Sequence, residues 1–423
     1  MKPVAVFFMF ACMVLAAPAV FANDTTKVKD VPQAVTLQLP QGFSAATITE
    51  SLGANRHIAV NTNGDIYVKL ERLKDGKGII VLRESGGKAQ VVNSFGNFAG
   101  SGIAIKNGYL YATTDDEVFR YKFNEKNEID PNQEPEKIIT GLVNRRQHAA
   151  KTIALDNAGN IYVNIGAPSN SCQIKDRENG SLGQDPCPIL KDAAGIWQFK
   201  ADKANQTYAD GERYATGLRN CVGLFWNDKL NALFAMQHGR DGLFQMFPGM
   251  YNAEQGAELP SEEMFMIKKG GNYGWPYCYY DQFQKKQILA PEYGGDKKKV
   301  GRCSVMDTPV MAFPGHWAPN AILFYTGNQF PAKYKNGAFI AFHGSWNRAP
   351  LKQKGYNVVF VPFKDGKVSG DYEVFAEGFK GAEELESPGD AVTRPCGLAQ
   401  GADGSLYISD DVKGTIWKIE YKK

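Results

Sequence analysis

The feature that most constrains the fold is a hairpin pattern that recurs six times along the chain. In residues 153–165, apolar residues alternate with other residues on both sides of the turn Asp156-Asn157-Ala158-Gly159-Asn160. Alternation with a period of two, interrupted by an Asn/Gly turn, predicts an antiparallel hairpin. The other copies lie in residues 59–68, 103–111, 222–236, 336–341 and 398–408.

Six hairpins separated by long insertions predict an all-β chain, folded as a six-bladed β-propeller. In this fold the inner strands face a central channel and the insertions form a functional rim. The 44 glycines and the scarcity of long helical patterns agree with this prediction. A ring of blades must close to leave no exposed edge, so we expect strand 35–39 to pair with the final strand, 415–419. A β-sandwich and two smaller β domains are the alternatives.

The N-terminal residues differ in composition from the rest of the chain. Lys2 precedes residues 4–20, which are almost wholly apolar, and small residues occupy the usual cleavage position. This pattern predicts a secretory signal peptide over residues 1–22, with an uncleaved anchor as the alternative. A flexible leader over 23–34 and a propeller domain over 35–423 follow. We therefore expect a periplasmic or secreted protein without stable membrane insertion.

The charge of the chain is nearly balanced. The 48 Lys and Arg residues exceed the 45 Asp and Glu residues by a net charge of +3. Such a balance gives no field suited to nucleic acid or to a membrane surface. We therefore expect no nucleic-acid partner.

Six of the seven cysteines lie beyond the N-terminal apolar run. An even number in an exported chain predicts disulfides, although six cysteines allow fifteen different pairings. The favoured pairs are Cys172–Cys187, Cys278–Cys303 and Cys221–Cys396. The first two would each close a loop rich in turn residues and contribute about 3 kcal/mol, and the third follows by elimination. No pair has the spacing of zinc ligands.

Polar residues stand directly before three of the hairpins, where a propeller places its inner rim. His148 precedes the third copy, Arg219 and Asn220 precede the fourth, and Arg394 precedes the sixth. Each arginine lies two residues before a cysteine, so the two occupy equivalent places in different blades. Two guanidinium groups in one channel favour an anionic ligand. The alternative for each residue is a structural role.

Three further segments combine glycine with polar or aromatic residues. The glycines of His238-Gly239-Arg240-Asp241-Gly242 let the backbone approach a ligand, and exposed carbonyls there suit calcium. The acidic pair Glu262-Glu263 follows. Residues 313–319 and 342–348 bring His316 and Arg348 beside tryptophans, a composition that suits a flat ring under an aromatic lid. Polar loops and core anchors are the alternatives.

Four motifs together carry a resemblance to a known family. They are Leu-Arg-Asn at 218–220, Gly-Gly-Asn-Tyr-Gly-Trp-Pro at 270–276, Phe-His-Gly-Ser-Trp-Asn-Arg at 342–348 and Arg-Pro-Cys-Gly-Leu at 394–398. In this combination the chain resembles the soluble quinoprotein glucose/sorbosone dehydrogenase family over about residues 40–420. The resemblance implies a six-bladed propeller that uses pyrroloquinoline quinone (PQQ) and calcium. It also implies oxidation of a sugar or a related alcohol or aldehyde, with an external electron acceptor.

The resemblance also implies roles for individual residues. His148 matches the general base that takes the substrate hydroxyl proton, and Arg219 matches the arginine that stabilises charge on the quinone. Contacts to the cofactor are implied for Asn220, His238, His316, Arg348 and Arg394. Metal ligation is implied for the carbonyls of Gly239 and Arg240, and for Glu263 at a second, structural calcium.

The chain departs from the family pattern at a few places. Ala167 stands where glucose-oxidising members have an aspartate that orients the histidine, and His238 replaces an uncharged amide. These departures leave the substrate open. A calcium-dependent hydrolase such as a lactonase, or a non-catalytic propeller that binds a ligand, are the rival functions, because fold alone does not set function. A hydrolase would need side-chain carboxylates converging on its metal.

Overall fold

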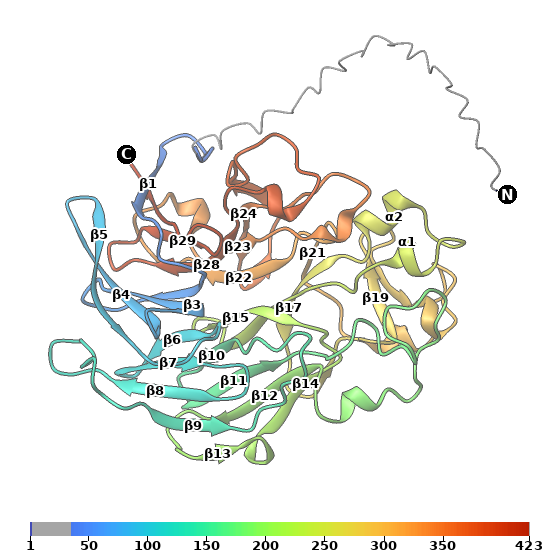
Figure 1. Ribbon diagram of the computed structural model, residues 1–423, viewed down its shortest axis with the longest axis horizontal. Coiled ribbons are helices and arrows are strands. Elements are labelled where there is room, and N and C mark those ends of the chain that lie inside the picture. Colours follow the sequence, from blue (N-terminus) through green and yellow to red (C-terminus); the bar gives the residue numbers. More distant parts are fainter. Residues whose placement is uncertain (2–34, 423) are drawn as a thin grey trace, which may run out of the picture. The chain divides into compact units, whose positions relative to one another are not determined.

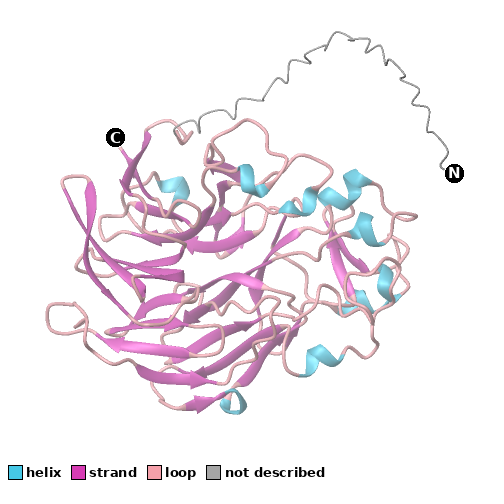
Figure 2. Cartoon of the chain, in the orientation of Figure 1, coloured by secondary structure: helices cyan, strands magenta, loops and turns pink. Residues whose placement is uncertain are grey.

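The computed structural model describes Met1 and residues 35–422. The predicted signal peptide (1–22) and leader (23–34) therefore lie outside the described residues, apart from Met1. From residue 35 onward the chain is almost entirely β, with two short α-helices (Figure 2). Six sheets of four or five strands are arranged around a common axis (Figure 1), which confirms the predicted six-bladed β-propeller.

The first three blades follow one another along the chain, and the innermost strand comes first in each. The first blade contains β2 (Asn55–Val60), β3 (Ile66–Lys74), β4 (Lys77–Ser85) and β5 (Lys88–Phe95). The second contains β6 (Ile103–Lys106), β7 (Tyr109–Thr113), β8 (Val118–Lys122), β9 (Glu136–Thr140) and β13 (Gln206–Thr207). The third contains β10 (Ile153–Leu155), β11 (Asn160–Ile165), β12 (Gly195–Lys200), β14 (Glu212–Thr216) and β18 (Gly271–Asn272).

The remaining blades repeat this order, and the sixth takes its outermost strand from the beginning of the domain. The fourth blade contains β15 (Cys221–Asn227), β16 (Ala232–Gln237), β17 (Glu262–Ile267) and β21 (Met311–Phe313). The fifth contains β22 (Pro319–Phe324), β23 (Ala338–Phe342), β24 (Asn357–Val361) and β27 (Glu373–Ala376). The sixth contains β28 (Pro395–Gln400), β29 (Leu406–Asp410), β30 (Ile416–Tyr421) and β1 (Phe43–Thr49).

Each predicted hairpin copy is the junction between the two innermost strands of a blade. In the third blade Asp156 closes the turn, because its Oδ1 accepts hydrogen bonds from the backbone N–H of Ala158 (2.9 Å) and Asn160 (2.8 Å). Gly159 has a φ of +79°, which favours glycine. The turn fixes the register, with Ile153 opposite Val163.

The ring closes through an N-terminal strand other than the predicted one. β1 pairs antiparallel with β30, so the prediction that residues 35–39 form the closing strand is wrong. Residues 35–39 contribute only an isolated bridge between Gln38 and Glu377. The side chain of Phe43 anchors β1, since its ring packs edge-on against Phe330 with the ring centroids 4.8 Å apart.

The blades pack face to face through apolar clusters. Between the fifth and sixth blades, Phe339, Phe360, Leu406 and Trp417 are all buried in one cluster. Dense packing of this kind leaves little freedom to the strands. The starts of the six innermost strands are therefore held in place around one end of the channel.

Long insertions extend the third and fourth blades. They include α1 (Leu243–Met246), α2 (Ala253–Glu258) and the hairpin of β19 (Cys278–Asp281) and β20 (Lys286–Leu289), and a small hairpin of β25 (Phe363–Lys364) and β26 (Lys367–Val368) follows in the fifth blade. The predicted disulfides Cys172–Cys187 and Cys278–Cys303 are both present in these insertions. No helix in residues 35–422 is long and apolar enough to cross a membrane.

The third predicted disulfide is wrong. Cys221 and Cys396 are free, buried thiols. Cys221 begins β15 in the fourth blade and Cys396 lies on β28 in the sixth, so the fifth blade separates them. Between them, the Asn320 side-chain amide lies 3.6 Å from the Cys396 sulfur.

Candidate active site

Two adjoining cavities lie where the innermost strands begin. The outer cavity has a volume of about 800 Å³ and the inner one about 170 Å³. His148, His238, Ala318 and Ser345 line both of them. The cavities therefore join residues from several blades, as the repeat pattern predicts.

His148 presents one ring nitrogen to these cavities. Its Nδ1 lies 2.5 Å from the Ala167 carbonyl oxygen, and because a carbonyl only accepts, Nδ1 must carry the hydrogen. Nε2 has no partner within residues 35–422 and is left as the acceptor. Burial and the neighbouring Arg219 lower the pKa of His148 to about 3, so the ring is neutral at physiological pH.

The backbone beside His148 compensates for the missing aspartate at position 167. The Ala167 carbonyl orients the ring from the place where a carboxylate was expected, and the Ala167 N–H donates to the Arg219 carbonyl (2.7 Å). Gly166 is required for the close approach, since a Cβ there would lie 2.6 Å from the Cβ of His148. The tautomer is thus set without an acidic partner.

Arg219 is buried and fixed by a carboxylate that the sequence prediction did not include. Its Nη2 lies 2.7 Å from Oδ2 of Asp241, and its Nη1 donates to the Gly239 carbonyl (3.0 Å). Asp241 also pairs with Arg177 (2.9 Å). Burial alone would raise the pKa of Asp241, but Arg219, His316 and Arg177 outweigh it and hold the pKa below its usual range.

Asn220 lines the outer cavity with an unsatisfied polar atom. Its Oδ1 is buried and has no hydrogen-bond partner among the described residues. An unpaired buried carbonyl costs free energy of about 1–3 kcal/mol. A ligand with a donor group at this place would recover that energy.

Two histidines and a glutamate form the wall of the inner cavity. The His238 Nε2 contacts the Pro319 carbonyl (2.9 Å), and burial and Arg219 lower the pKa of His238 to about 4. His316 is buried and contacts the Gly256 carbonyl (3.0 Å). The neighbouring Glu262 was not among the predicted site residues, although it lines this cavity.

Glu262 is held by backbone donors. Its carboxylate accepts hydrogen bonds from the N–H of Gly239 (2.9 Å) and Ala318 (3.0 Å). Burial raises its pKa to about 7, against the effect of these hydrogen bonds. Burial thus disfavours the charged form of Glu262, while the two backbone donors favour it.

The predicted metal ligands fall in different environments. Gly239 lines the inner cavity, whereas the Arg240 side chain turns away and pairs with Glu292 (2.7 Å). Only the backbone of Arg240 is thus available to a cation. Residues 35–422 contain no group of three or more His, Cys, Asp or Glu side chains that could hold a metal.

The prediction that Glu263 binds a second, structural calcium stays a prediction. Neighbouring strand residues face opposite sides, so Glu262 faces the cavity and Glu263 faces away, where its carboxylate accepts from the Gln237 amide (2.6 Å). Burial raises the pKa of Glu263 to about 8. The other carboxylate oxygen of Glu263 is buried and has no hydrogen-bond partner within residues 35–422.

Arg394 lies beside a network of charges on the outer cavity. Its Nε donates to the His343 carbonyl (3.0 Å). The His343 ring contacts Asp411 (2.8 Å), and Asp411 also pairs with Arg56 (2.9 Å). Of this network, only Arg394 was predicted as a site residue, and Arg56, His343 and Arg394 all line the cavity.

The prediction that Arg348 contacts a cofactor is contradicted. Arg348 is 1% exposed and lines neither cavity. Its Nη2 pairs with Glu258 (2.6 Å), and its Nη1 donates to the carbonyls of Ala257 (2.8 Å) and Gly315 (3.0 Å). Arg348 therefore anchors its loop to the end of α2.

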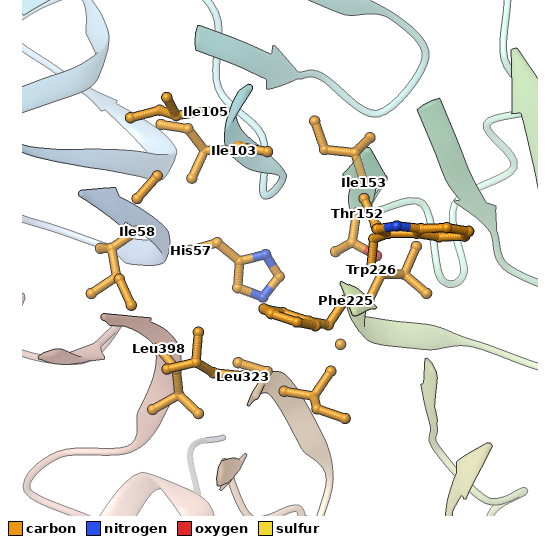
Figure 3. A pocket seen from close by; sticks show the side chains of 18 of the residues that line it. His57, Ile58, Ile103, Ile105, Thr152, Ile153, Phe225, Trp226, Leu323 and Leu398 are labelled. Carbon is orange, nitrogen blue, oxygen red and sulfur yellow. The ribbon is translucent and has the colours of Figure 1, made fainter. Parts of the chain in front are cut away.

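Behind the outer cavity, the channel continues as an apolar cavity of about 370 Å³. Figure 3 shows the His57 ring within it, surrounded by aliphatic side chains such as Ile58 and Leu398. The His57 Nε2 contacts the Asn320 carbonyl (2.8 Å). All five histidines of the chain thus line the channel or the two cavities at its end.

Comparison with solved structures agrees with the fold. The holo form of the pyranose dehydrogenase PQQ domain from Coprinopsis cinerea is 20% identical in sequence to this chain. The match covers 92% of this chain and 98% of that domain, with a TM-score of 0.73. A calcium structure of the Trichoderma reesei Carbohydrate-Active Enzymes Family AA12 protein is 21% identical with the same coverage, and its TM-score is 0.72.

Comparison with curated sequences and family descriptions gives the family. A pyrroloquinoline quinone-dependent sugar dehydrogenase of Hypocrea jecorina is 24% identical over 412 residues, covering 90% of this chain and 88% of that protein. A pyrroloquinoline quinone-dependent pyranose dehydrogenase of Coprinopsis cinerea is 23% identical over 431 residues, and the match covers 91% of this chain but only 54% of that protein. The family model described as TrAA12-like matches residues 37–422 of this chain. With a propeller and polar cavities spanning the same residues, the chain belongs to the TrAA12-like family.

Proposed function

We propose that this chain is an exported, PQQ- and calcium-dependent dehydrogenase that oxidises a sugar, or an alcohol or aldehyde derived from a sugar. The observation that carries the proposal is the convergence of His148, Arg219 and Asn220 on two adjoining cavities, with a neutral histidine nitrogen free to take a proton. The relatives named as PQQ-dependent sugar and pyranose dehydrogenases support the substrate class.

The residues present fit PQQ. Its carboxylates need cations, and Arg56 and Arg394 line the outer cavity. The unsatisfied Oδ1 of Asn220 offers an acceptor to a donor group of the cofactor. The outer cavity also has a volume typical of ligand sites, which is about 300–1,000 Å³. His238 and His316 would contact the cofactor from the inner cavity.

Each residue has a chemical task in the proposed reaction. The bound quinone supplies the acceptor for a hydride from the substrate carbon. His148 takes the hydroxyl proton on Nε2 while Nδ1–H stays on the Ala167 carbonyl. The low pKa of His148 lets it release this proton between turnovers. Arg219, held by Asp241, stabilises negative charge that develops beside it.

Calcium is proposed at the carbonyls of Gly239 and Arg240. The Gly239 carbonyl oxygen accepts a hydrogen bond from Arg219 with one lone pair and keeps a second lone pair for a cation. The carboxylates of Asp241 and Glu262 line the same inner cavity and favour a hard, oxygen-liganded cation there. Such a cation would act as a Lewis acid.

Export is proposed from the cysteines and the N-terminal sequence. Two disulfides are typical of proteins that fold in an oxidising compartment. We infer a periplasmic or secreted location and an external electron acceptor.

Reconstitution tests the proposal. The purified chain is titrated with PQQ, with and without calcium, and dye reduction is followed over aldoses, sorbosone and simple alcohols. Saturable PQQ absorbance and calcium-dependent turnover are expected, and His148→Ala should retain PQQ binding but lose turnover. Absence of PQQ binding would overturn the proposal. Hydrolysis of a lactone by the cofactor-free protein would favour the hydrolase instead.

A further inference from the structure

Trp346 differs from the other five tryptophans of the chain in its exposure. Four tryptophans are buried, namely Trp197, Trp275, Trp317 and Trp417. Trp226 is half-buried and stacks on Tyr162, with ring centroids 5.3 Å apart. Trp346 is 65% exposed, and its ring makes none of the aromatic contacts found within residues 35–422. It nevertheless lines the outer cavity.

The loop that carries Trp346 is firmly held on both sides. Before it, Arg394 donates hydrogen bonds to the carbonyls of His343 and Gly344. After it, the Asn347 side chain donates to Oδ1 of Asp241 (2.7 Å), and Arg348 is buried. A mobile surface loop would not have these anchors, so the backbone that carries the exposed ring is held beside the cavity.

An exposed indole on an anchored loop at a polar cavity suits a sugar ring. The face of an indole carries partial negative charge and attracts the weakly positive C–H groups of an apolar face. Pyranoses have such C–H faces, whereas a small open-chain aldehyde does not cover an indole. Burial of the exposed ring against a ligand also removes apolar surface from water.

Two carboxylates on the same cavity offer acceptors to a sugar. Glu71 and Asp115 line the outer cavity and form none of the ion pairs found within residues 35–422. Free carboxylates accept hydrogen bonds from sugar hydroxyls. These groups therefore suit the hydroxyl edge of a ring whose C–H face lies on the indole.

We propose that Trp346 is the platform on which a pyranose ring stacks, and that it gives the enzyme its preference for ring-form sugars over small aldehydes. This inference rests on the proposed function, since it concerns the substrate of the same site. Trp346 would determine specificity by holding the ring, and it would take no part in proton or hydride transfer.

Steady-state kinetics of the reconstituted enzyme test this role. The substrates are D-glucose, D-galactose and D-xylose, with glyceraldehyde as the comparison. Trp346→Ala should raise KM for the best pyranose about tenfold and leave kcat nearly unchanged, and Trp346→Phe should recover most of the affinity. KM for glyceraldehyde should be the same in all three proteins. An unchanged KM for the pyranose, or an equal rise for glyceraldehyde, would overturn the proposal.

Two binding measurements separate this inference from the proposed function. In the cofactor-free protein, the same sugars should change tryptophan emission, and Trp346→Phe should abolish the change. PQQ affinity, followed by absorbance, should be equal in the wild type and in Trp346→Ala. A parallel loss of PQQ affinity would mean that the indole packs on the cofactor and would overturn the platform. If the wild type oxidises no sugar, the oxidation proposal fails, but the emission change still decides whether Trp346 binds a sugar.

Discussion

The Nε2 atom of His343 lies 2.8 Å from Oδ1 and 2.9 Å from Oδ2 of Asp411. The other four histidines of the chain each place a ring nitrogen on a backbone carbonyl instead. His343 is therefore the histidine whose charge is linked to an acid at the outer cavity. Burial lowers the pKa of His343, and the carboxylate of Asp411 opposes that shift.

Replacing this acid tests the network. Asp411→Asn should lower the free energy of unfolding by about 3 kcal/mol at pH 7, because Arg56 loses its buried partner. Arg56, Arg394 and His343 hold the pKa of Asp411 below its usual range. The stabilisation is thus present above the unfolded pKa and is lost as pH falls through the folded value. Urea unfolding of both proteins at pH 7 and pH 3 should show a smaller difference at pH 3, which lies below the unfolded pKa, and an equal difference would contradict the linkage.

The contact between Gly166 and His148 predicts a position-specific loss of activity. Gly166→Ala would place a Cβ 2.6 Å from the His148 Cβ and should displace the proposed base. We expect turnover of the reconstituted enzyme to fall by about a hundredfold, the lower range for a misplaced base. Gly159→Ala is the matched control, because it costs backbone strain at a φ of +79° but has open space around it. Equal turnover in the two variants would contradict the placement of His148.

The burial of Lys69 predicts that the free energy of unfolding depends on pH in the alkaline range. Lys69 is fully buried, its Nζ donates to the Phe98 carbonyl (2.6 Å), and burial lowers its pKa to about 7. Between pH 7 and the ordinary lysine pKa the unfolded chain binds more protons, so this residue makes the wild type more stable as pH rises. The stability of the wild type relative to Lys69→Met should increase by up to about 1.4 kcal/mol per pH unit from pH 7 to 10. A difference independent of pH would contradict the burial of a titrating lysine.

The burial of the two free thiols predicts that they resist alkylation in the native protein. Cys221 and Cys396 are buried, and burial raises the pKa of the Cys396 thiol to about 12 and that of Cys221 further. A thiol reagent without reductant should therefore not label these residues in the native protein, whereas peptide mapping after unfolding should find both alkylated. Recovery of a peptide that joins them through a disulfide would restore the pairing that the structure contradicts.

The sequence predicted the features that are encoded locally. A turn such as that at Asp156 is made within five residues, so the six hairpins and their number were visible. The closing strand was not, because its choice depends on distant packing of Phe43 against Phe330. Apolar and polar residues alternate more regularly in residues 35–39 than in β1. Val35, Leu37 and Leu39 pack against the core, yet the segment forms a backbone bridge only at Gln38.

The sequence predicted those site residues that lie directly before, or at the start of, the innermost strand of a blade. His148, Arg219, Asn220 and Arg394 share that position, and the structure places all four at one end of the channel. Arg348 does not lie at this end of the channel. The chain turns between His343 and Arg348 and buries the guanidinium group against Glu258. Asp241 was overlooked because its partners Arg219 and Arg177 are distant in sequence.

The pairing of β1 with β30 ties the beginning of the domain to its end. The outer strand of the sixth blade, β1, is synthesised first and has no partner until β30, the last strand of the domain, has been made. Contacts between such distant segments carry a high loop-closure cost and form slowly. A chain shortened by its final strand would keep most of the site residues and yet remain an open ring. We therefore expect ring closure, more than assembly of any single blade, to set when the newly made protein becomes able to bind its ligands.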